Sequence, residues 1–408
     1  MKIEYLAKAS AKAAVLVVFV ADDRKLHGAA VALDRDSGGA LGRALSAPRF
    51  TGKRGQVLDV LAPAGLKAQR VVLAGLGKPG DLTALAAREI GAAIGGHLQA
   101  EHEPAATIIV DLPKGAKLDA GSFAANLGLG AQLRNYRFTK YRRQLPAEDP
   151  KPLKALEIVT EAQGAAKKLA VRLEAVGNGV AFARDLVNEP PVALYPETFV
   201  QRAKELTKLG VEVKVLDEKD MAKLGMGGVL AVGKGSANPP RLLVLRWKGA
   251  KSGKKGDGPV ALVGKGVCFD SGGLCIKTGA QMETMKGDMA GGAAVVGAIR
   301  ALAERKAKID VVGIVALVEN MSNGLAFKPG DVVTTLAGKT IEIFDTDAEG
   351  RVILVDALWY TAQQFKPRCI IDLATLTYSV MQALGKYFTG LFSNDDKLAQ
   401  HLSAAGEI

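Results

Sequence analysis

Residues 309–318 read Ile-Asp-Val-Val-Gly-Ile-Val-Ala-Leu-Val, an almost uninterrupted apolar run. A strand with one solvated face alternates apolar and polar residues, whereas a strand covered on both faces is apolar nearly throughout. The run therefore predicts an inner strand of a sheet that has helices on both of its faces.

The neighbouring segments alternate between strand and helix signals. Short runs rich in Val, Ile and Leu predict strands, and longer segments with helical apolar spacing predict helices. The expected strands are Val211–Val215, Arg241–Trp247, Pro259–Val263, Thr340–Phe344 and Cys369–Leu373, and the expected helices are Glu218–Leu224, Met289–Arg305 and Val352–Phe365. This order predicts an α/β domain with a central mixed sheet covered by helices.

The first 150 residues carry a second, smaller α/β pattern without a catalytic constellation. The expected elements are strands at Ala14–Val20, Val57–Leu61, Arg70–Leu73 and Ala106–Val110 and a helix at Asp81–Glu101. A polar, proline-rich stretch at 145–152 marks the boundary, and a long helix at about Glu161–Leu186 follows it. We therefore divide the chain into an N-terminal α/β domain (1–150), a linker helix (151–187) and a catalytic domain (188–408).

The composition fits an α/β enzyme better than an all-β protein, because 48% of the 408 residues are hydrophobic but only 5% are aromatic. The three cysteines form no CxxC pair, which argues for a reducing compartment and against a disulfide framework or a thiolate zinc site. No apolar run approaches the roughly 18 residues of a membrane-spanning helix. The short run at 13–20 reads better as a buried first strand than as a signal peptide. We expect a cytoplasmic protein with no membrane partner.

The net charge of +12 allows binding to nucleic acid. Many lysines have the spacing of solvated helix faces, but residues 134–143 (RNYRFTKYRR) interleave aromatic and basic side chains. This segment is either a nucleic-acid patch or an interdomain segment whose aromatic rings pack while its arginines stay solvated. We favour the second interpretation.

Charged residues cluster where the sequence is otherwise glycine-rich and apolar. Lys265, Asp270, Lys277 and Asp288 are threaded between glycines, and residues 345–351 read Asp-Thr-Asp-Ala-Glu-Gly-Arg. Lys265 and Asp270 follow the strand expected at Pro259–Val263. In the same way, residues 345–351 follow the strand expected at Thr340–Phe344. Ligand sites gather at the carboxyl ends of strands in α/β sheets. We therefore expect these side chains to meet at one edge of the sheet.

The charges of the cluster predict a pair of metal ions. Asp270, Asp288, Asp347 and Glu349 carry four negative charges, which two divalent cations would neutralise, whereas unpaired buried carboxylates are costly. All four histidines lie elsewhere, so carboxylates and perhaps an amine must supply the ligands. Lys265 can coordinate only as a neutral amine, a form that a nearby dication favours. Lys277 and Arg351 remain to polarise a substrate oxygen and to hold an anion. The alternative, a set of surface ion pairs, does not explain the glycine-rich surroundings.

These residues resemble those of the cytosolic leucyl aminopeptidases, a family of dinuclear metallo-exopeptidases. The resemblance is strong from about residue 180 to 408 and weaker before that. It rests on segments 184–188, 263–273, 282–289, 319–321, 328–332, 346–351 and 374–377, together with Lys277.

The resemblance implies a role for each site residue. Lys265, Asp270, Asp288, Asp347 and Glu349 would be metal ligands, with Asp270 and Glu349 bridging two ions of Mn or Zn, or else Mg or Co. Lys277 would polarise the scissile carbonyl, and Arg351 would hold a bicarbonate that acts as general base. Met285, Thr375, Leu376 and Tyr378 would line the substrate pocket. The family is hexameric.

The chain departs from the family pattern in three places. Asp345 stands where the family has asparagine, and Tyr378-Ser379 stand where it has glycine and alanine. Family members also continue for several tens of residues beyond the position of residue 408, so the catalytic domain looks C-terminally incomplete. We expect Tyr378 to narrow the substrate pocket.

The leading hypothesis is a metal-dependent aminopeptidase that removes leucine and other apolar residues from the N-terminus of peptides. Water activated by the two metals would attack the first peptide carbonyl. Two alternatives remain: a DNA-binding accessory protein, supported by the net charge and residues 134–143, and an altered or truncated aminopeptidase of weak activity.

Overall fold

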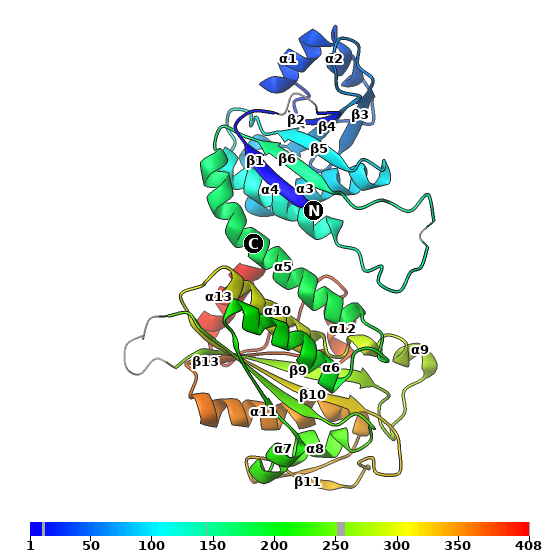
Figure 1. The fold of residues 1–408 in the computed structure, drawn as a ribbon, viewed down its shortest axis with the longest axis vertical. Coiled ribbons are helices and arrows are strands. Elements are labelled where there is room, and N and C mark those ends of the chain that lie inside the picture. Colours follow the sequence, from blue (N-terminus) through cyan, green and yellow to red (C-terminus); the bar gives the residue numbers. More distant parts are fainter. Residues whose placement is uncertain (10–12, 145, 251–257, 408) are drawn as a thin grey trace. The chain divides into compact units, whose positions relative to one another are not determined.

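The computed structural model describes residues 1–9, 13–144, 146–250 and 258–407, which form two compact units (Figure 1). The first unit contains Met1–Gly177 and Phe392–Ile408, and the second contains Asn178–Leu391. Helix α5 (Gln163–Asn188) carries the chain from the first unit into the second.

The first unit is built on a six-stranded sheet with the order β1-β6-β5-β2-β4-β3. All neighbouring strands are parallel except β3 and β4. The strands are β1 (Lys2–Leu6), β2 (Val15–Ala21), β3 (Val57–Leu61), β4 (Arg70–Gly77), β5 (Ala105–Ile109) and β6 (Ala155–Val159). The helices are α1 (Ala29–Asp36), α2 (Ala40–Ala44), the 3-10 turn η1 (Pro79–Asp81), α3 (Ala84–Ala100), α4 (Ala120–Asn135) and, at the far end of the chain, α13 (Asp396–Gly406).

Helices cover both faces of this sheet because the inner strands are apolar on both sides. Val17 and Phe19 of β2 belong to a core that includes α3 and α4. Val18 and Val20 of the same strand point to a second core, which includes residues of α1 and α2. The uninterrupted apolar run of β2 thus gives a three-layered arrangement.

The second unit is built on a five-stranded mixed sheet with the order β13-β9-β10-β8-β7. Strands β13, β9 and β10 are parallel, and β8 is antiparallel to both of its neighbours. These strands are β7 (Glu212–Leu216), β8 (Arg241–Lys248), β9 (Val260–Asp270), β10 (Asp310–Asn320) and β13 (Cys369–Leu373). Residues of α8 and α11 cover one face, and residues of α5, α6 and α10 cover the other. This mixed sheet between helices confirms the predicted α/β fold class.

The remaining elements of the second unit complete the helical layers and one hairpin. They are α6 (Pro196–Ala203), η2 (Lys204–Leu209), α7 (Glu218–Leu224), α8 (Gly227–Gly233), α9 (Gly279–Met282), η3 (Met285–Gly287), α10 (Ala290–Glu304), β11 (Val332–Thr334), β12 (Thr340–Glu342), η4 (Thr346–Ala348), α11 (Glu349–Phe365) and α12 (Ser379–Leu384). Among the described residues, no helix combines the length and apolar character needed to cross a membrane.

The structure corrects three expectations about strands. Strand β9 does not stop at Val263 but continues through Gly264 and Gly266 to Asp270, because β10 pairs with it over that length. The segment expected at Thr340–Phe344 forms only a hairpin with β11, in a separate sheet. The run at 13–20 is the second strand rather than the first, since β1 precedes it.

Candidate active site

Three parallel strands end at the same edge of the central sheet, and the candidate site lies there. Asp270 is the last residue of β9, Asn320 is the last residue of β10, and Thr375 follows β13 by two residues. Lys265 lies inside β9, so the prediction that it follows the strand is wrong. Asp270 and Lys265 are 2% and 3% exposed, so both charges are held in the interior.

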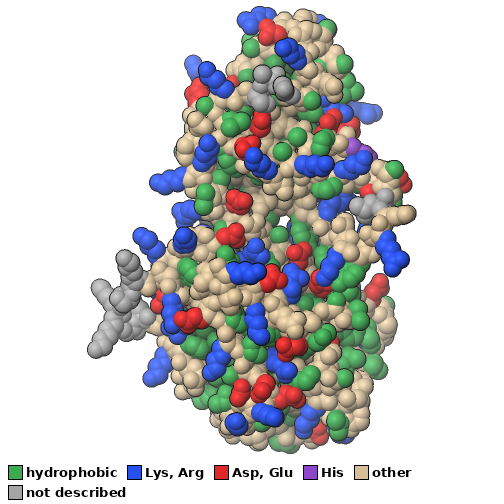
Figure 2. All heavy atoms as spheres, viewed as in Figure 1, with side chains coloured by type: hydrophobic (Ala, Val, Ile, Leu, Met, Phe, Trp, Pro, Cys, Tyr) green, Lys and Arg blue, Asp and Glu red, His purple; other side chains and the backbone are tan. Residues whose placement is uncertain are grey.

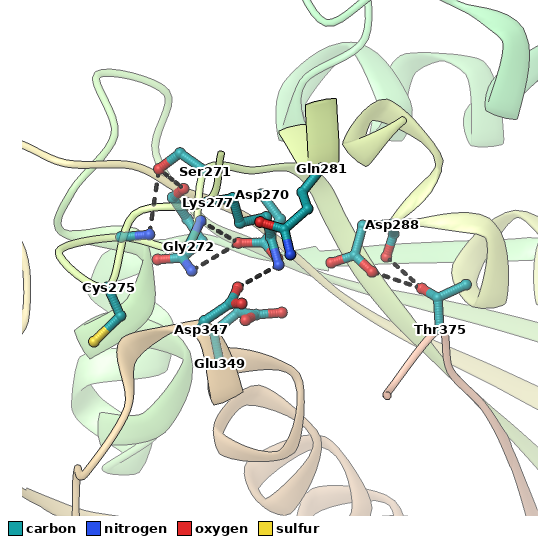
Figure 3. Close-up of polar contacts among 12 residues, drawn as sticks. Asp270, Ser271, Gly272, Cys275, Lys277, Gln281, Asp288, Asp347, Glu349 and Thr375 are labelled. Atoms are coloured by element: carbon teal, nitrogen blue, oxygen red, sulfur yellow. Dashed lines mark hydrogen bonds and ion pairs between the residues drawn. The ribbon is translucent and has the colours of Figure 1, made fainter. Parts of the chain in front are cut away.

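The turn after β9 brings Lys277 back to Asp270. Gly272 and Gly273 have φ angles of +84° and +64°, a conformation that glycine adopts at low cost. The Lys277 N–H then donates to the Ser271 carbonyl at 3.0 Å. The Lys277 ammonium lies 3.0 Å from Asp270 Oδ2 and forms a short ion pair with Asp347. Figure 3 shows these side chains pointing toward one another.

Asp347 and Glu349 come from the loop that begins α11, and not from the end of a central strand as expected. Asp347 lies in η4, and Glu349 is the first residue of α11 and is fully buried. A carboxylate is favoured at a helix N-terminus by the helix dipole. Asp345 accepts a hydrogen bond from the Asp347 N–H at 2.8 Å, which makes it a local cap of this loop.

Asp288 lies directly before α10, as the sequence predicts, and has two partners. The Thr375 hydroxyl donates to Asp288 Oδ1 at 2.7 Å (Figure 3). The Lys265 ammonium lies 2.9 Å from Asp288 Oδ2 and 2.8 Å from Glu349 Oε1, and donates to the Thr375 carbonyl at 3.0 Å. Gly350 leaves room for this lysine, because a Cβ atom there would come within 2.8 Å of Lys265 Cε.

The cluster fits divalent cations. Carboxylate oxygens of Asp270, Asp347 and Glu349 all lie within 4.8 Å of one another. Glu349 Oε2 is buried and accepts no hydrogen bond within the described part of the chain, and the ion pair with Lys265 is made through the other oxygen, Oε1. With Asp288, four carboxylates face two lysines, and three of the four, Asp270, Asp288 and Glu349, are buried, so the negative charge exceeds the positive charge in a water-poor site. A set of oxygen ligands with an excess of negative charge suits hard divalent ions.

Burial shifts the pKa values of the charged groups in this cluster. Burial raises the pKa of Glu349 to about 7 and that of Asp288 to about 6, although Lys265 opposes both shifts. Burial also raises the pKa of Asp347. Burial works to lower the pKa of Lys265, but Glu349 and Asp288 offset it and the net shift is upward. The carboxyls therefore hold their protons more tightly than usual, as expected where counter-charge is lacking.

The other predicted residues lie on elements of the same unit. Arg351 is exposed on the first turn of α11, and Met285 is half-buried in η3. Leu376 and Tyr378 are 42% and 71% exposed. Thr375 contacts Asp288 directly, whereas the pocket-lining roles of these residues remain predictions.

Two residues to which the sequence assigns no role, Asn320 and Thr346, form hydrogen bonds to the strand end and turn that carry Asp270. Both are fully buried. The Asn320 amide donates to Asp270 Oδ1 at 2.8 Å and to the Thr346 carbonyl at 3.0 Å. A polar residue that ends an otherwise apolar inner strand was the available signal for Asn320.

Residues 134–143 contact one another and nearby backbone. The Phe138 and Tyr141 rings lie 6.0 Å apart, and the Lys140 ammonium lies 5.3 Å from the Tyr141 ring. Arg137 donates to the Pro150 carbonyl. On the face drawn in Figure 2, basic side chains are scattered among acidic and apolar ones and form no single patch.

The fold and the carboxylate–lysine cluster define a metal-dependent hydrolase. The model of the cytosol aminopeptidase family matches the chain with its catalytic domain at residues 181–408 and with its N-terminal domain at residues 17–145. The chain belongs to the cytosol aminopeptidase family and is a metal-dependent aminopeptidase. The DNA-binding alternative is not favoured.

Relatives and solved structures agree with this assignment. The chain is 48% identical to a probable cytosol aminopeptidase of Bradyrhizobium sp. and 47% identical to one of Nitrobacter winogradskyi. Each match covers 100% of this chain and 80% of the relative. A mutant of tomato leucine aminopeptidase superposes with a TM-score of 0.85 at 31% identity, over 100% of this chain and 80% of that one. The bottromycin maturation enzyme BotP in complex with Mn gives 0.80 at 35% identity, over 97% and 79%.

Proposed function

We propose that the chain removes single residues from the N-terminus of peptides, with leucine and other apolar residues preferred, at a centre of two divalent ions. The observation that carries this proposal is the buried, under-compensated carboxylate cluster at the carboxyl ends of β9 and β10. Manganese is the first choice of metal because BotP was solved in complex with Mn, and zinc is the second. Magnesium and cobalt are further candidates, and magnesium in particular suits carboxylate ligands.

Five side chains would hold the ions: Lys265, Asp270, Asp288, Asp347 and Glu349. Asp270 and Glu349 would bridge the two ions, and Lys265 would take part as a neutral amine. When bound, the ions would supply a water of lowered pKa as nucleophile and polarise the peptide carbonyl. The free α-amine of a substrate would bind one of the ions in its neutral form, which would favour the N-terminus of a peptide over an internal segment.

Lys277 would stabilise the developing negative charge on the carbonyl oxygen. Asp347 and Asp270 more than offset the effect of burial, so the pKa of Lys277 is raised and the side chain stays charged at neutral pH. Its side chain is 14% exposed, so it retains access to a bound substrate. A preorganised ammonium in a water-poor site is an effective donor to an oxyanion.

Arg351 would hold an anion, for which we propose bicarbonate, that accepts a proton from the attacking water. Its guanidinium stands on the first turn of α11, where the helix dipole also favours an anion. Arg351→Met should therefore lower kcat, and added bicarbonate should no longer stimulate the variant.

Substrate preference would come from Met285, Thr375, Leu376 and Tyr378. Tyr378 stands at the beginning of α12 and presents a large ring. Its replacement by glycine is expected to raise kcat/KM for bulky N-terminal residues relative to alanine. An unchanged substrate profile would contradict the idea that this ring narrows the pocket.

Hydrolysis of leucine-p-nitroanilide by the chelator-treated chain, with and without added Mn²⁺ or Zn²⁺, tests the proposed function. We expect turnover only with metal, and none with N-acetyl-leucine-p-nitroanilide, which lacks the free amine. Metal-independent turnover, or equal cleavage of the acetylated substrate, would refute an aminopeptidase of this kind.

We further propose a cytoplasmic homohexamer, since the resemblance implies that assembly. Light scattering on a gel-filtration column gives the mass directly. A monomeric mass in an active sample would show that this chain works without the family's assembly.

A further inference from the structure

Asn320 joins two loops that carry the proposed metal ligands. Its side chain is 0% exposed at the end of β10. One hydrogen of its amide group is donated to Asp270 Oδ1 and the other to the Thr346 carbonyl, over 2.8 and 3.0 Å. The first loop begins after Asp270, the last residue of β9, and the second contains Asp347 and ends at Glu349, the first residue of α11.

The same contact distinguishes the two oxygens of Asp270. Oδ1 accepts hydrogen bonds from Asn320 and from the Gly272 N–H, which is also 2.8 Å away (Figure 3). Oδ2 instead faces the Lys277 ammonium at 3.0 Å. The carboxylate is thus fixed in rotation, with one oxygen bound to the protein interior and the other turned toward the cluster.

Thr346 forms the second half of this connection. Its hydroxyl donates to the Gly272 carbonyl at 2.7 Å and accepts from the Cys275 N–H at 2.8 Å. Its own N–H lies 3.5 Å from Cys275 Sγ. One threonine therefore contacts the turn after β9 at three points and brings the following residue, Asp347, alongside it.

The packing around these two residues leaves little freedom. A Cβ atom on Gly273 would come within 2.9 Å of Asn320 Oδ1 and 3.0 Å of Thr346 Oγ1, so the backbone of the turn lies directly against both side chains. Asn320 Oδ1 has no hydrogen-bond partner in the described ranges. The contribution of Asn320 to the site is therefore the pair of hydrogen bonds that its amide group donates.

We propose that Asn320 and Thr346 are positioning residues that lock the two ligand-bearing loops together, so that Asp270, Asp347 and Glu349 are already in register before metal binds. The inference rests on the proposed metal centre. Neither residue touches substrate or metal; both act through the carboxylates that they hold. Removing a side chain that orients a metal ligand typically costs about 10–100-fold in metal affinity.

The first test measures Mn²⁺ binding by calorimetry to the chelator-treated chain and to the Asn320→Ala variant. We expect the dissociation constant to rise by about 10–100-fold. The matched control is Thr361→Ala, which removes another fully buried side chain of the same unit, one that donates to the Ala357 carbonyl on α11. Thermal unfolding of both metal-free variants then separates lost stability from lost affinity.

The second test uses Thr346 and remains informative if Asn320→Ala does not fold. Thr346→Ser keeps the hydroxyl, whereas Thr346→Val keeps the shape and loses it. We expect Thr346→Ser to bind Mn²⁺ within about threefold of the parent and Thr346→Val to bind it about tenfold more weakly. In the double variant the losses should be less than additive, because both residues serve the same connection.

The outcomes separate the inference from the proposed function. Parent-like Mn²⁺ affinity in Asn320→Ala and Thr346→Val, or an equal loss in the Thr361→Ala control, would overturn the positioning role while leaving the metal site intact. No Mn²⁺ binding by the parent would overturn the metal centre and the inference with it. Weakened Mn²⁺ binding in the variants of a chain that hydrolyses no peptide would support the inference and contradict the proposed reaction.

Discussion

Among the described residues, two groups of side chains bring their ligand atoms within 4.8 Å of one another, close enough to hold a metal ion, and the two groups lie in different units. The first consists of Asp59, His97 and Glu101, and the second of Asp270, Asp347 and Glu349. Both come from the ends or edges of sheets and from neighbouring helices. Proximity alone therefore does not distinguish them.

The first group already has a fixed counter-charge. The Arg70 guanidinium forms a short ion pair with Asp59 and lies 3.0 Å from Glu101 and 3.2 Å from Glu103. His97 Nε2 lies 3.0 Å from both oxygens of Asp59. Arginine does not lose its proton in proteins, so the positive charge at the centre of this group is permanent.

The second group is compensated by lysines and only in part. Lys265 and Lys277 face four carboxylates, and Glu349 Oε2 accepts no hydrogen bond from the described residues. A lysine can become neutral when a dication approaches, whereas an arginine cannot. The two groups thus differ in the nature of the counter-charge and not in the closeness of the acids, and we propose that this difference separates a structural cluster from a metal site.

Matched glutamate variants should give the largest contrast between the two groups. Glu349→Gln is expected to lower kcat/KM by roughly a thousandfold or more, because it removes a proposed bridging ligand. Glu101→Gln removes one carboxylate from the first group and should leave kcat/KM within about twofold. Activity and Mn²⁺ stoichiometry are measured on both. Similar losses in the two variants would remove the distinction.

Lys277→Met should separate catalysis from metal binding inside the second group. We expect kcat to fall roughly 100- to 1000-fold, since a donor to the developing oxyanion is lost. Mn²⁺ affinity should not fall, because the variant removes a positive charge beside Asp270 and Asp347. Steady-state kinetics and calorimetry give the two quantities separately. A loss of Mn²⁺ binding equal to the loss of kcat would make Lys277 a structural partner of the carboxylates instead.

The pH dependence of the free energy of unfolding should test the raised pKa values of Glu349 and Asp288. Glu349 and Asp288 have pKa values raised to about 7 and about 6, so the folded, metal-free chain binds more protons than the unfolded chain above about pH 4. The free energy of unfolding should therefore fall as pH rises from 5 to 8. Glu349 contributes about 2 units (pH 5 to 7) and Asp288 about 1 unit (pH 5 to 6), so the fall is about 4 kcal/mol at 1.4 kcal/mol per unit. Denaturant unfolding at several pH values measures it.

Two further measurements test whether the carboxyl groups of the cluster cause this pH dependence. Glu349→Gln should flatten the slope, because glutamine has no proton to lose. Saturating Mn²⁺ should reverse it, since metal competes with protons for the same carboxylates. A parent chain whose metal-free stability rises between pH 5 and 8 would contradict the raised pKa values.

Local sequence patterns predicted most of the fold. The strand at Cys369–Leu373 and the helix at Glu218–Leu224 have the expected bounds, because apolar runs and helical spacing are local signals. The full length of β9 was not predictable, since Gly264 and Gly266 around a lysine look like a loop. Only pairing with β10, more than 40 residues away in the chain, keeps that segment extended.

The charged residues of the site could be predicted from the sequence, but not the elements that carry them or the buried residues that hold them by hydrogen bonds. Carboxylates and lysines among glycines identified Asp270, Lys277 and Glu349, which the structure brings together. The route by which Glu349 arrives was wrong, because β12 belongs to a separate hairpin. Asn320 was identifiable only as a polar end of an apolar strand, since its two hydrogen bonds reach residues 50 and 26 positions away.

A variant of Arg70 tests whether the permanent counter-charge of the first group keeps metal away, and its expected effect is the smallest. Arg70→Met leaves Asp59, Glu101 and Glu103 without their common partner and should cost about 1–2 kcal/mol of stability, between the values for exposed and buried ion pairs. Activity should be unchanged. If a permanent guanidinium is what keeps metal from the first group, this variant should also gain one weak Zn²⁺ site at Asp59, His97 and Glu101. The control is Arg54→Met, which removes a single ion pair with Glu89 and should gain no Zn²⁺ site.

Calorimetry with Zn²⁺ in excess of the active-site ions shows whether the additional site has formed. Destabilisation without added binding would mean that burial, and not the choice between arginine and lysine, makes the second group a metal site.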